Sequence, residues 1–270
     1  MIALRLLVIM FAVIISIPLL LTITASFDDL RTPKVPPRLI PHFTLANYAR
    51  MMRENPVGLW MFNSVFLATA TGGISTALSL AAGFGFEKKV FPGRELLYVI
   101  VLISMTIPAT MLILPKFLMV KRLGLYNTRL GLILPFATSA GMIFFARNYF
   151  RGFPDEYLDE AEIMGSGELS TFTRIVLPIS GPVVALASIG TFLGAYHNYM
   201  WQLVMIKNNR LLTIVLGIQE AVQRYLIFQA DGRPAYSLSA AGTVLAFLPV
   251  VVLFCIFQKR FIGGFYGSKS

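Results

Sequence analysis

The sequence predicts an all-α protein that crosses a membrane six times. Of its 270 residues, 56% are hydrophobic and only 13% are charged, and the mean hydropathy of +0.73 lies outside the range of soluble domains. Six long stretches contain no Asp, Glu, Lys or Arg: residues 6–27, 55–86, 96–115, 130–146, 175–206 and 234–258. Because roughly 20 apolar residues cross a bilayer as a helix, each stretch suffices for one crossing.

The first stretch, residues 6–27, also fits a signal peptide. Its apolar core is longer than such a peptide needs, and Ile23-Thr24-Ala25 is a poor cleavage site. We therefore expect an uncleaved first helix. The stretches 55–86 and 175–206 are long enough for more than one crossing, but both begin with polar loop residues, so we expect one crossing from each.

The polar segment between the fourth and fifth stretches holds six of the thirteen carboxylates: Asp155, Glu156, Asp159, Glu160, Glu162 and Glu168. Pro154 and the first acids favour a helix N-terminus, and Gly165 is suited to end or bend that helix. The segment is either a docking element or an acidic linker on the membrane surface. Docking is the better interpretation, because helices that lie on membranes are normally basic.

Spacing gives this segment a resemblance to a known motif. It reads Asp159-Glu160-Ala161, three residues, Gly165, nine residues, Ile175, one residue, and Leu177-Pro178. This resembles the EAA motif, EAA-x3-G-x9-I-x-LP, of ABC importer permeases. Asp and Glu replace the usual Glu and Ala at its start, and Met164 replaces a common Asp.

Further segments resemble the same family in order along the chain: Phe43–Tyr48, Asn63-Ser64, Phe91–Arg94, Leu123–Thr128, Gly131–Pro135, Phe257–Phe261 and Gly263-Gly264. Together they are similar to the six-span, maltose-system type of carbohydrate permease. The resemblance implies a single permease domain over 1–270, with segment 27–57 extracytoplasmic. It also implies that segment 151–180 is a cytoplasmic coupling-helix loop that docks on an ATPase.

The location implied is the bacterial inner membrane, with both termini cytoplasmic. Charge does not support this orientation by count, since ten of the 23 Lys and Arg residues then lie inside and thirteen outside. The clusters Lys88-Lys89 and Lys259-Arg260, which flank helix ends, agree with it.

An external energy source is indicated by two patterns. The six stretches lack the ionisable groups that ion-coupled transporters place at membrane depth, and no GxxxxGK[ST] loop occurs. The resemblance implies two ATPase subunits that carry ATP and Mg, a second permease in a heterodimer and an extracytoplasmic solute-binding protein. We expect contact with membrane lipid, no nucleic-acid partner and no cofactor on this chain.

Catalysis by the chain itself is not indicated. Two histidines and one cysteine do not supply a metal site, and GxSxG and HExxH are absent. These absences disfavour an intramembrane protease or lipid transferase, so we expect a transport subunit.

A polar and aromatic cluster interrupts the fifth stretch: Tyr196, His197, Asn198, Tyr199, Trp201 and Gln202. On a continuous helix, Asn198 and Gln202 share one face, and His197 and Trp201 share the next. Amides and rings suit a sugar pathway, but they also suit interhelical packing and an aromatic belt. Both interpretations stay open.

The solute class is carbohydrate by resemblance, with glycerol phosphate, polyamine or phosphate as alternatives. Under the expected orientation the outer segments carry thirteen basic and five acidic residues, and the inner ones ten basic and eight acidic. The outer excess can steer an anionic solute. The preferred explanation is that it docks the binding protein or lipid headgroups.

Overall fold

The computed structural model describes residues 2–28, 42–228 and 236–266, and every regular element within them is a helix. The long helices are α1 (Ile2–Ser26), α3 (Val57–Lys88), α11 (Gly181–Tyr196), α13 (Ile214–Phe228) and α14 (Tyr236–Tyr266). The others are α2 (Ala46–Glu54), α4 (Arg94–Thr106), α5 (Ile113–Arg122), α6 (Arg129–Ile133), α7 (Ala140–Arg151), α8 (Glu156–Ile163), α9 (Glu168–Thr171), α10 (Leu177–Ile179) and α12 (Tyr199–Met205). Short turns η1 (Leu134–Phe136), η2 (Phe172–Val176) and η3 (Asn209–Leu211) complete the order. The all-α prediction is confirmed for these residues.

Three helices in the described part of the chain are long and apolar enough to cross a membrane alone: Leu4–Ser26, Val57–Lys88 and Tyr236–Ile256. Two bent pairs meet the same test together. Arg129–Phe136 with Ala140–Arg151 bends by 44°, and Glu168–Ile179 with Gly181–Tyr196 bends by 90°. The structure is therefore that of a helical membrane protein with three to five candidate crossings, fewer than the six predicted.

The missing crossing is the stretch 96–115, which is not one helix. Helix α4 ends at Thr106, and α5 begins only at Ile113. Ile107 between them is extended, with φ −84° and ψ 119°. Pro108 follows it, and a proline disfavours helical backbone in the preceding residue. The absence of charge predicted the length of this apolar stretch, but it did not predict the break.

The chain divides into two compact units, Met1–Asn63 with Leu212–Val251, and Ser64–Leu211 with Val252–Ser270. In unit 1 the side chain of Asn47, which is fully buried, donates to the carbonyls of Ser26 (2.9 Å) and Asp28 (2.8 Å). The Tyr48 hydroxyl lies 2.7 Å from the Ser26 hydroxyl. The Asn-Tyr pair of the Phe43–Tyr48 segment thus ties α2 to the end of α1. The single domain over 1–270 stays a prediction.

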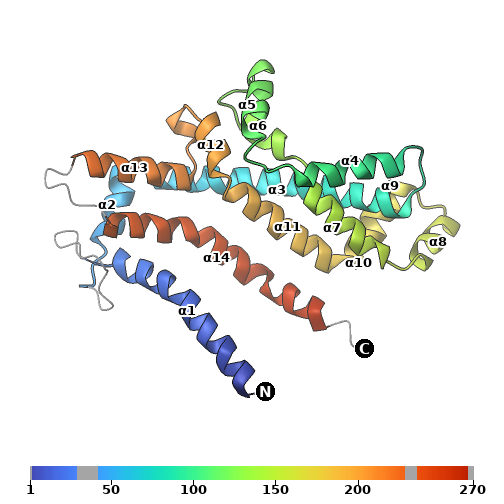
Figure 1. The fold of residues 1–270 in the computed structure, drawn as a ribbon, viewed down its shortest axis with the longest axis horizontal. Helices are drawn as coiled ribbons and strands as arrows, with labels where there is room; N and C mark the ends of the chain where they lie inside the picture. Colours follow the sequence, from blue (N-terminus) through green and yellow to red (C-terminus); the bar gives the residue numbers. More distant parts are fainter. Residues whose placement is uncertain (1, 29–41, 229–235, 267–270) are drawn as a thin grey trace. The chain divides into compact units, whose positions relative to one another are not determined.

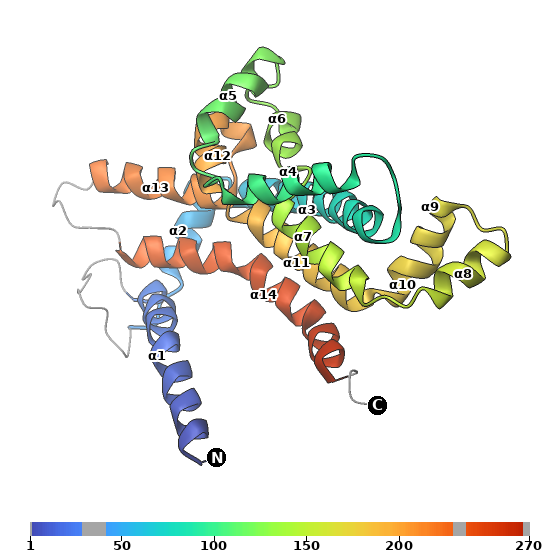
Figure 2. The ribbon, with the colours of Figure 1, turned by 45° about the vertical axis from the view of Figure 1, so that its right-hand side comes forward.

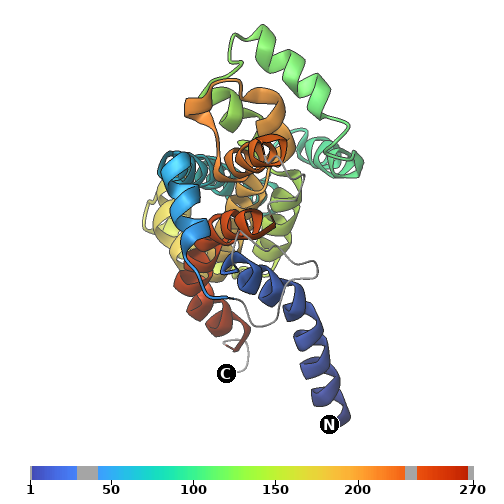
Figure 3. The same cartoon turned by 90° about the vertical axis from the view of Figure 1, so that its left-hand side faces the viewer.

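Unit 2 carries both predicted functional segments, at opposite ends (Figures 1 and 2). Helices α8 and α9 lie at one end. Helices α5, α6 and α12 gather at the other, where α12 packs against α5 and α6 (Figure 3). Between the ends, α3 approaches its neighbours closely, because a Cβ on Gly72 would lie 3.0 Å from the backbone of Phe192 in α11. A Cβ on Gly83 would lie 2.8 Å from the backbone nitrogen of Arg147 in α7.

Candidate functional site: an anchored acidic loop and a polar pocket

The acidic loop contains the expected helix, α8, and Gly165 ends it. Gly165 has a φ of +69°, in the left-handed region that L side chains rarely adopt. Its N–H donates to the Glu162 carbonyl, and the Ser166 N–H donates to the Ala161 carbonyl, both at 2.9 Å. These paired bonds form a Schellman motif, which satisfies the last carbonyls of the helix. A Cβ at Gly165 would meet nothing within 4 Å, so backbone conformation alone calls for glycine.

The motif residues of α8 divide between surface and interior. Asp159 and Glu160 are exposed, whereas Ala161 is buried. Beyond them Ile163 and Met164 are 87% and 73% exposed, so the loop presents large apolar side chains beside its carboxylates. An apolar surface ringed by charge is typical of a protein interaction site.

At the end of the motif, Leu177 packs inward and Pro178 is exposed. Ile175 lies in the π-helical turn η2, and Leu177-Pro178 starts α10. Leu177 packs against a buried cluster that is formed by α3, α7, η2 and α11, together with Phe153 from the turn after α7. The cluster consists of Leu80, Phe84, Ala146, Phe150, Phe153, Phe172, Val176, Val183 and Ala187. This cluster fixes where the loop leaves and re-enters the helical body.

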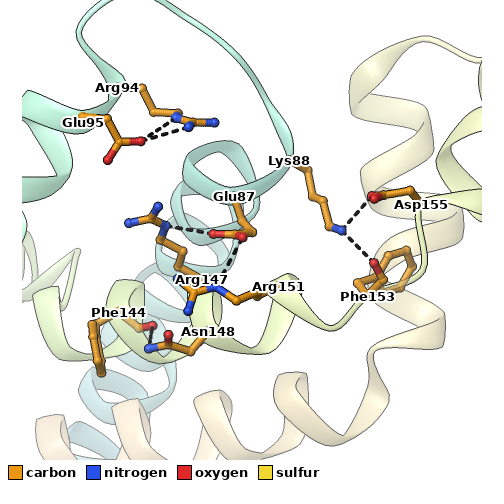
Figure 4. A network of polar contacts seen from close by, with 10 residues as sticks. All are labelled: Glu87, Lys88, Arg94, Glu95, Phe144, Arg147, Asn148, Arg151, Phe153 and Asp155. Atoms are coloured by element: carbon orange, nitrogen blue, oxygen red, sulfur yellow. Dashed lines mark hydrogen bonds and ion pairs between the residues drawn. The ribbon is translucent and has the colours of Figure 1, made fainter.

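Ion pairs add a second anchor at the C-terminal end of α3 (Figure 4). The Lys88 ammonium donates to the Phe153 carbonyl and to Asp155, both at 2.7 Å, and its side chain is only 9% exposed. Lys89 pairs with Glu168 at 2.8 Å, where both side chains are exposed. Lys88 at the end of α3 and Lys89 directly after it therefore contact the loop before α8 and after it.

Glu87 ties the same end of α3 to α7. Its carboxylate accepts a hydrogen bond from Arg147 Nε at 2.9 Å and lies 3.5 Å from Arg151 Nε (Figure 4). The Arg147 guanidinium also covers the Tyr98 ring, 3.7 Å from its centroid. The Glu87 and Arg147 side chains are 17% and 13% exposed, so water screens this pair less than it screens the other pairs. Sequence analysis missed these anchors, because Glu87 and Arg147 are 60 residues apart.

A small pocket with polar and apolar lining lies at the opposite end of unit 2. Side chains of α3, α6, η1, α11 and α12, with Asn198 between the last two, line it: Leu67, Thr71, Leu132, Phe136, Ala195, Asn198, Trp201 and Gln202. Its volume of about 10 Å³ holds about one water molecule and no sugar ring. A solute of that size requires the lining helices to separate.

Only half of the residues predicted for a substrate path line this pocket, namely Asn198, Trp201 and Gln202. Tyr196 is buried and stacks on Phe192 with ring centroids 5.9 Å apart. His197 is exposed, its Nδ1 lies 3.1 Å from the Leu193 carbonyl, and Tyr199 is half-buried. None of these three lines the pocket.

The predicted pairing of His197 with Trp201 is therefore wrong, whereas Asn198 and Gln202 do line the pocket together. Helix α11 ends at Tyr196 and α12 begins at Tyr199, so the backbone turns at His197 and Asn198. That break places Trp201 with Asn198 and separates it from His197.

Packing holds Trp201 in its place. Its indole N–H donates to the Gly131 carbonyl at 3.2 Å, and its ring meets the Phe136 ring edge-on with centroids 5.7 Å apart. Sequence analysis did not assign Phe136 or Thr71 to the pathway. The available signals were a threonine within an apolar helix and an aromatic directly after the Gly131–Pro135 segment.

Comparisons with known proteins agree with this architecture. The family described as "Binding-protein-dependent transport system inner membrane component" matches residues 73–263. The chain is 33% identical over 205 residues to the arabinooligosaccharides transport system permease protein AraQ of Bacillus subtilis, covering 76% of this chain and 70% of AraQ. It is 31% identical over 222 residues to the lactose transport system permease protein LacG of Rhizobium radiobacter, covering 82% and 79%.

Among solved structures, one chain of a bacterial ABC transporter involved in the import of the acidic polysaccharide alginate has the same fold. Its TM-score is 0.82 at 20% identity, and the match covers 96% of this chain and 95% of that one. The family match spans well over half of the present sequence. The chain therefore belongs to the family of inner-membrane components of binding-protein-dependent transport systems.

Proposed function

We propose that the chain is the membrane-spanning permease subunit of an ATP-binding-cassette importer, and that it translocates a carbohydrate delivered by a solute-binding protein. The observation that carries this proposal is the loop 151–180, in which a short helix ended by Gly165 exposes acids and apolar side chains while its flanks are anchored to α3. The names of AraQ and LacG, which transport arabino-oligosaccharides and lactose, support carbohydrate over glycerol phosphate, polyamine or phosphate.

Six crossings are part of the proposal. The third is formed by α4 and α5 together, and the fourth and fifth by the bent helix pairs. Both termini and the loop 151–180 then face the cytoplasm of a bacterium, and segment 27–57 lies outside, although its residues 29–41 are beyond the described part of the chain. The whole of 1–270 forms one permease domain.

Helix α8 is the proposed coupling helix. Asp159, Glu160 and Gly165 shape its surface, Ala161 is buried beneath it, Leu177 packs against the helical body, and Ile175 and Pro178 complete the motif. Two partner ATPase subunits bind ATP and Mg and supply the energy, and this chain catalyses no reaction. A second permease subunit pairs with it to complete the pathway, in which Asn198, Trp201 and Gln202 contact the solute.

Cysteine labelling tests the orientation. In a Cys255→Ser background, we expect Ser166→Cys to react with a membrane-impermeant maleimide only in inverted vesicles. Glu54→Cys, which lies just before the second crossing, is the matched outer control and should react only in right-side-out vesicles. Labelling of Ser166→Cys from outside would overturn both the orientation and the docking role.

Transport by the complete complex in proteoliposomes tests the solute class. We expect ATP-dependent uptake of a labelled di- or oligosaccharide in the presence of the solute-binding protein. Uptake of glycerol phosphate, phosphate or a polyamine in place of sugars would support the alternatives. Uptake that needs no ATP would refute the importer itself.

A further inference from the structure

Basic residues without acidic neighbours in the sequence surround the pocket end of unit 2. Residues 107–139 and 197–211 contain six Lys and Arg: Lys116, Lys121, Arg122, Arg129, Lys207 and Arg210. No Asp or Glu occurs anywhere in 96–154 or 169–219. The carboxylates of unit 2 are confined to Glu87, Glu95 and the acidic loop.

The distance along α3 separates these acids from the pocket. Glu87 lies sixteen residues beyond Thr71, which lines the pocket. At 1.5 Å per residue this is about 24 Å of helix, more than twice the Debye length at physiological salt. Within unit 2, the acidic loop therefore does not neutralise the positive field at the pocket.

One of the six cations lies next to the pocket lining. The Lys116 Nζ atom stands over the Phe136 ring, 4.6 Å from its centroid, and Phe136 lines the pocket beside Trp201. Lys116 is half-buried. Among the residues that the structure describes, no carboxylate lies within ion-pair distance of Lys116.

The Asn127 side chain holds a second turn that carries a basic residue, Lys207, at the same end of unit 2. The Asn127 side-chain oxygen accepts from the backbone N–H groups of Lys207 (2.9 Å) and Asn208 (3.0 Å). Asn127 itself has a φ of +56°, and Arg129 two residues later covers the Phe66 ring at 4.9 Å. The turn after α12 is thus fixed beside the turn after α5.

We propose that this pocket, once its lining helices separate, selects sugars that carry an anionic substituent, a carboxylate or a phosphate, and that the Lys116 ammonium contacts that substituent. The inference rests on the proposed function, and it names the solute class for the same site. A contact with one ring leaves ammonium N–H donors available to an anion. An anion would also offset the burial that disfavours the charge of Lys116.

The test compares two disaccharides of equal size, one neutral and one in which a uronate replaces one sugar, in ATP-dependent uptake by the reconstituted complex. Each rate is expressed as variant over wild type, so that the preference of the solute-binding protein cancels. We expect Lys116→Gln to lower uptake of the uronate about tenfold while uptake of the neutral sugar stays within about twofold. Lys116→Arg, which keeps the charge, should retain most uronate uptake.

Lys121→Gln is the matched control. Lys121 lies on the same helix, and its ammonium is 6.0 Å from the centroid of the Phe117 ring, which is not part of the pocket lining. It should change both rates by less than about twofold. An equal loss for both sugars in Lys116→Gln would make Lys116 a packing residue and overturn the proposal, as would an equal uronate loss in Lys121→Gln.

Two wild-type outcomes separate this inference from the proposed function. Uptake of the neutral sugar alone would overturn the anion selectivity and leave the carbohydrate importer standing. Uptake of neither sugar, with transport of another solute class, would refute both.

Discussion

The two ends of unit 2 use charge in opposite ways. At the loop end, carboxylates and cations occur together and form short contacts, so that Lys88, Lys89 and Glu87 fix the loop and α7 to α3. At the pocket end, cations occur without carboxylates in the neighbouring sequence, and the pocket is held by ring packing and one indole hydrogen bond. At the loop end the charges are held in contacts with one another, whereas at the pocket end the Lys116 ammonium lies against an aromatic ring.

Breaking the shape of the loop should have the largest effect. Gly165→Val places a β-branched residue in a left-handed conformation that costs an L residue about 1–2 kcal/mol, enough to change a conformational equilibrium about 5- to 30-fold. We therefore expect ATPase stimulation by the loaded binding protein to fall about 5- to 30-fold while the complex still assembles, as measured after co-purification.

Gly167→Val is the control for that experiment. Gly167 has φ −69° and ψ 155°, an extended conformation that valine adopts readily, and its Cβ would also meet nothing within 4 Å. It should keep ATPase stimulation within about twofold. If both variants lose stimulation equally, the bulk added to the loop surface matters and the turn does not.

The turn at Gly165 could be predicted from the sequence because its cause is local. A motif of fixed spacing predicted Gly165 as the end of a helix, and the Schellman bonds within five residues are that end. The ion pairs that hold the loop to α3 could not be predicted from the sequence. Lys88 and Asp155 are 67 residues apart, and their contact depends on how α3 and α7 pack around Phe150 and its neighbours.

The pocket was likewise only partly predictable from the sequence. Three of the residues chosen by type, Asn198, Trp201 and Gln202, line the pocket, but a continuous helix was assumed where the backbone turns. The broken stretch 96–115 has a similar origin. Absence of charge measures how well a segment suits lipid, whereas Pro108 and its extended neighbour decide whether the segment is one helix.

The pocket end is tested by removing one polar group at a time. We expect Asn198→Ala to lower sugar uptake about five- to tenfold with basal ATPase activity intact, because a lost hydrogen bond in a desolvated passage costs about 1–3 kcal/mol. His197→Ala is the control, since His197 is exposed and outside the pocket lining, and it should stay within about twofold. Unchanged uptake in Asn198→Ala would assign the cluster to packing.

Trp201 requires two variants, because it is buried and hydrogen-bonded to Gly131. Trp201→Ala should lower uptake and also destabilise the protein by about 3–5 kcal/mol. Trp201→Phe keeps most of the packing and loses the indole N–H. Loss of uptake in Trp201→Phe at a nearly normal melting temperature would assign the ring to the solute path.

A smaller effect is expected from the buried ion pair at the loop end. Glu87→Gln keeps the shape and an acceptor oxygen for Arg147 but removes the charge, so we expect a cost of about 1 kcal/mol and a loss of coupling of about threefold. Thermal unfolding and the ratio of sugar imported to ATP hydrolysed measure the two effects. Glu95→Gln is the control, because Glu95 is exposed and, among the described residues, forms an ion pair only with its neighbour in the chain, Arg94, so it should change neither.

The smallest expected effect is a difference in sugar uptake between variants of the two lysines that contact the loop, Lys88 and Lys89. Lys89 and Glu168 are 41% and 79% exposed, and exposed pairs of this kind contribute about 0–1 kcal/mol, so Lys89→Ala should change sugar uptake by less than about twofold. Lys88 is 9% exposed and donates to a backbone carbonyl as well as to Asp155, so Lys88→Ala leaves a buried carbonyl without its donor and should lower uptake more. Raising the salt concentration should weaken the Lys89 contact alone, because water and ions reach it. Equal losses in the two variants would mean that burial does not decide which contact anchors the loop, and the net charge at the end of α3 would then be the quantity that matters.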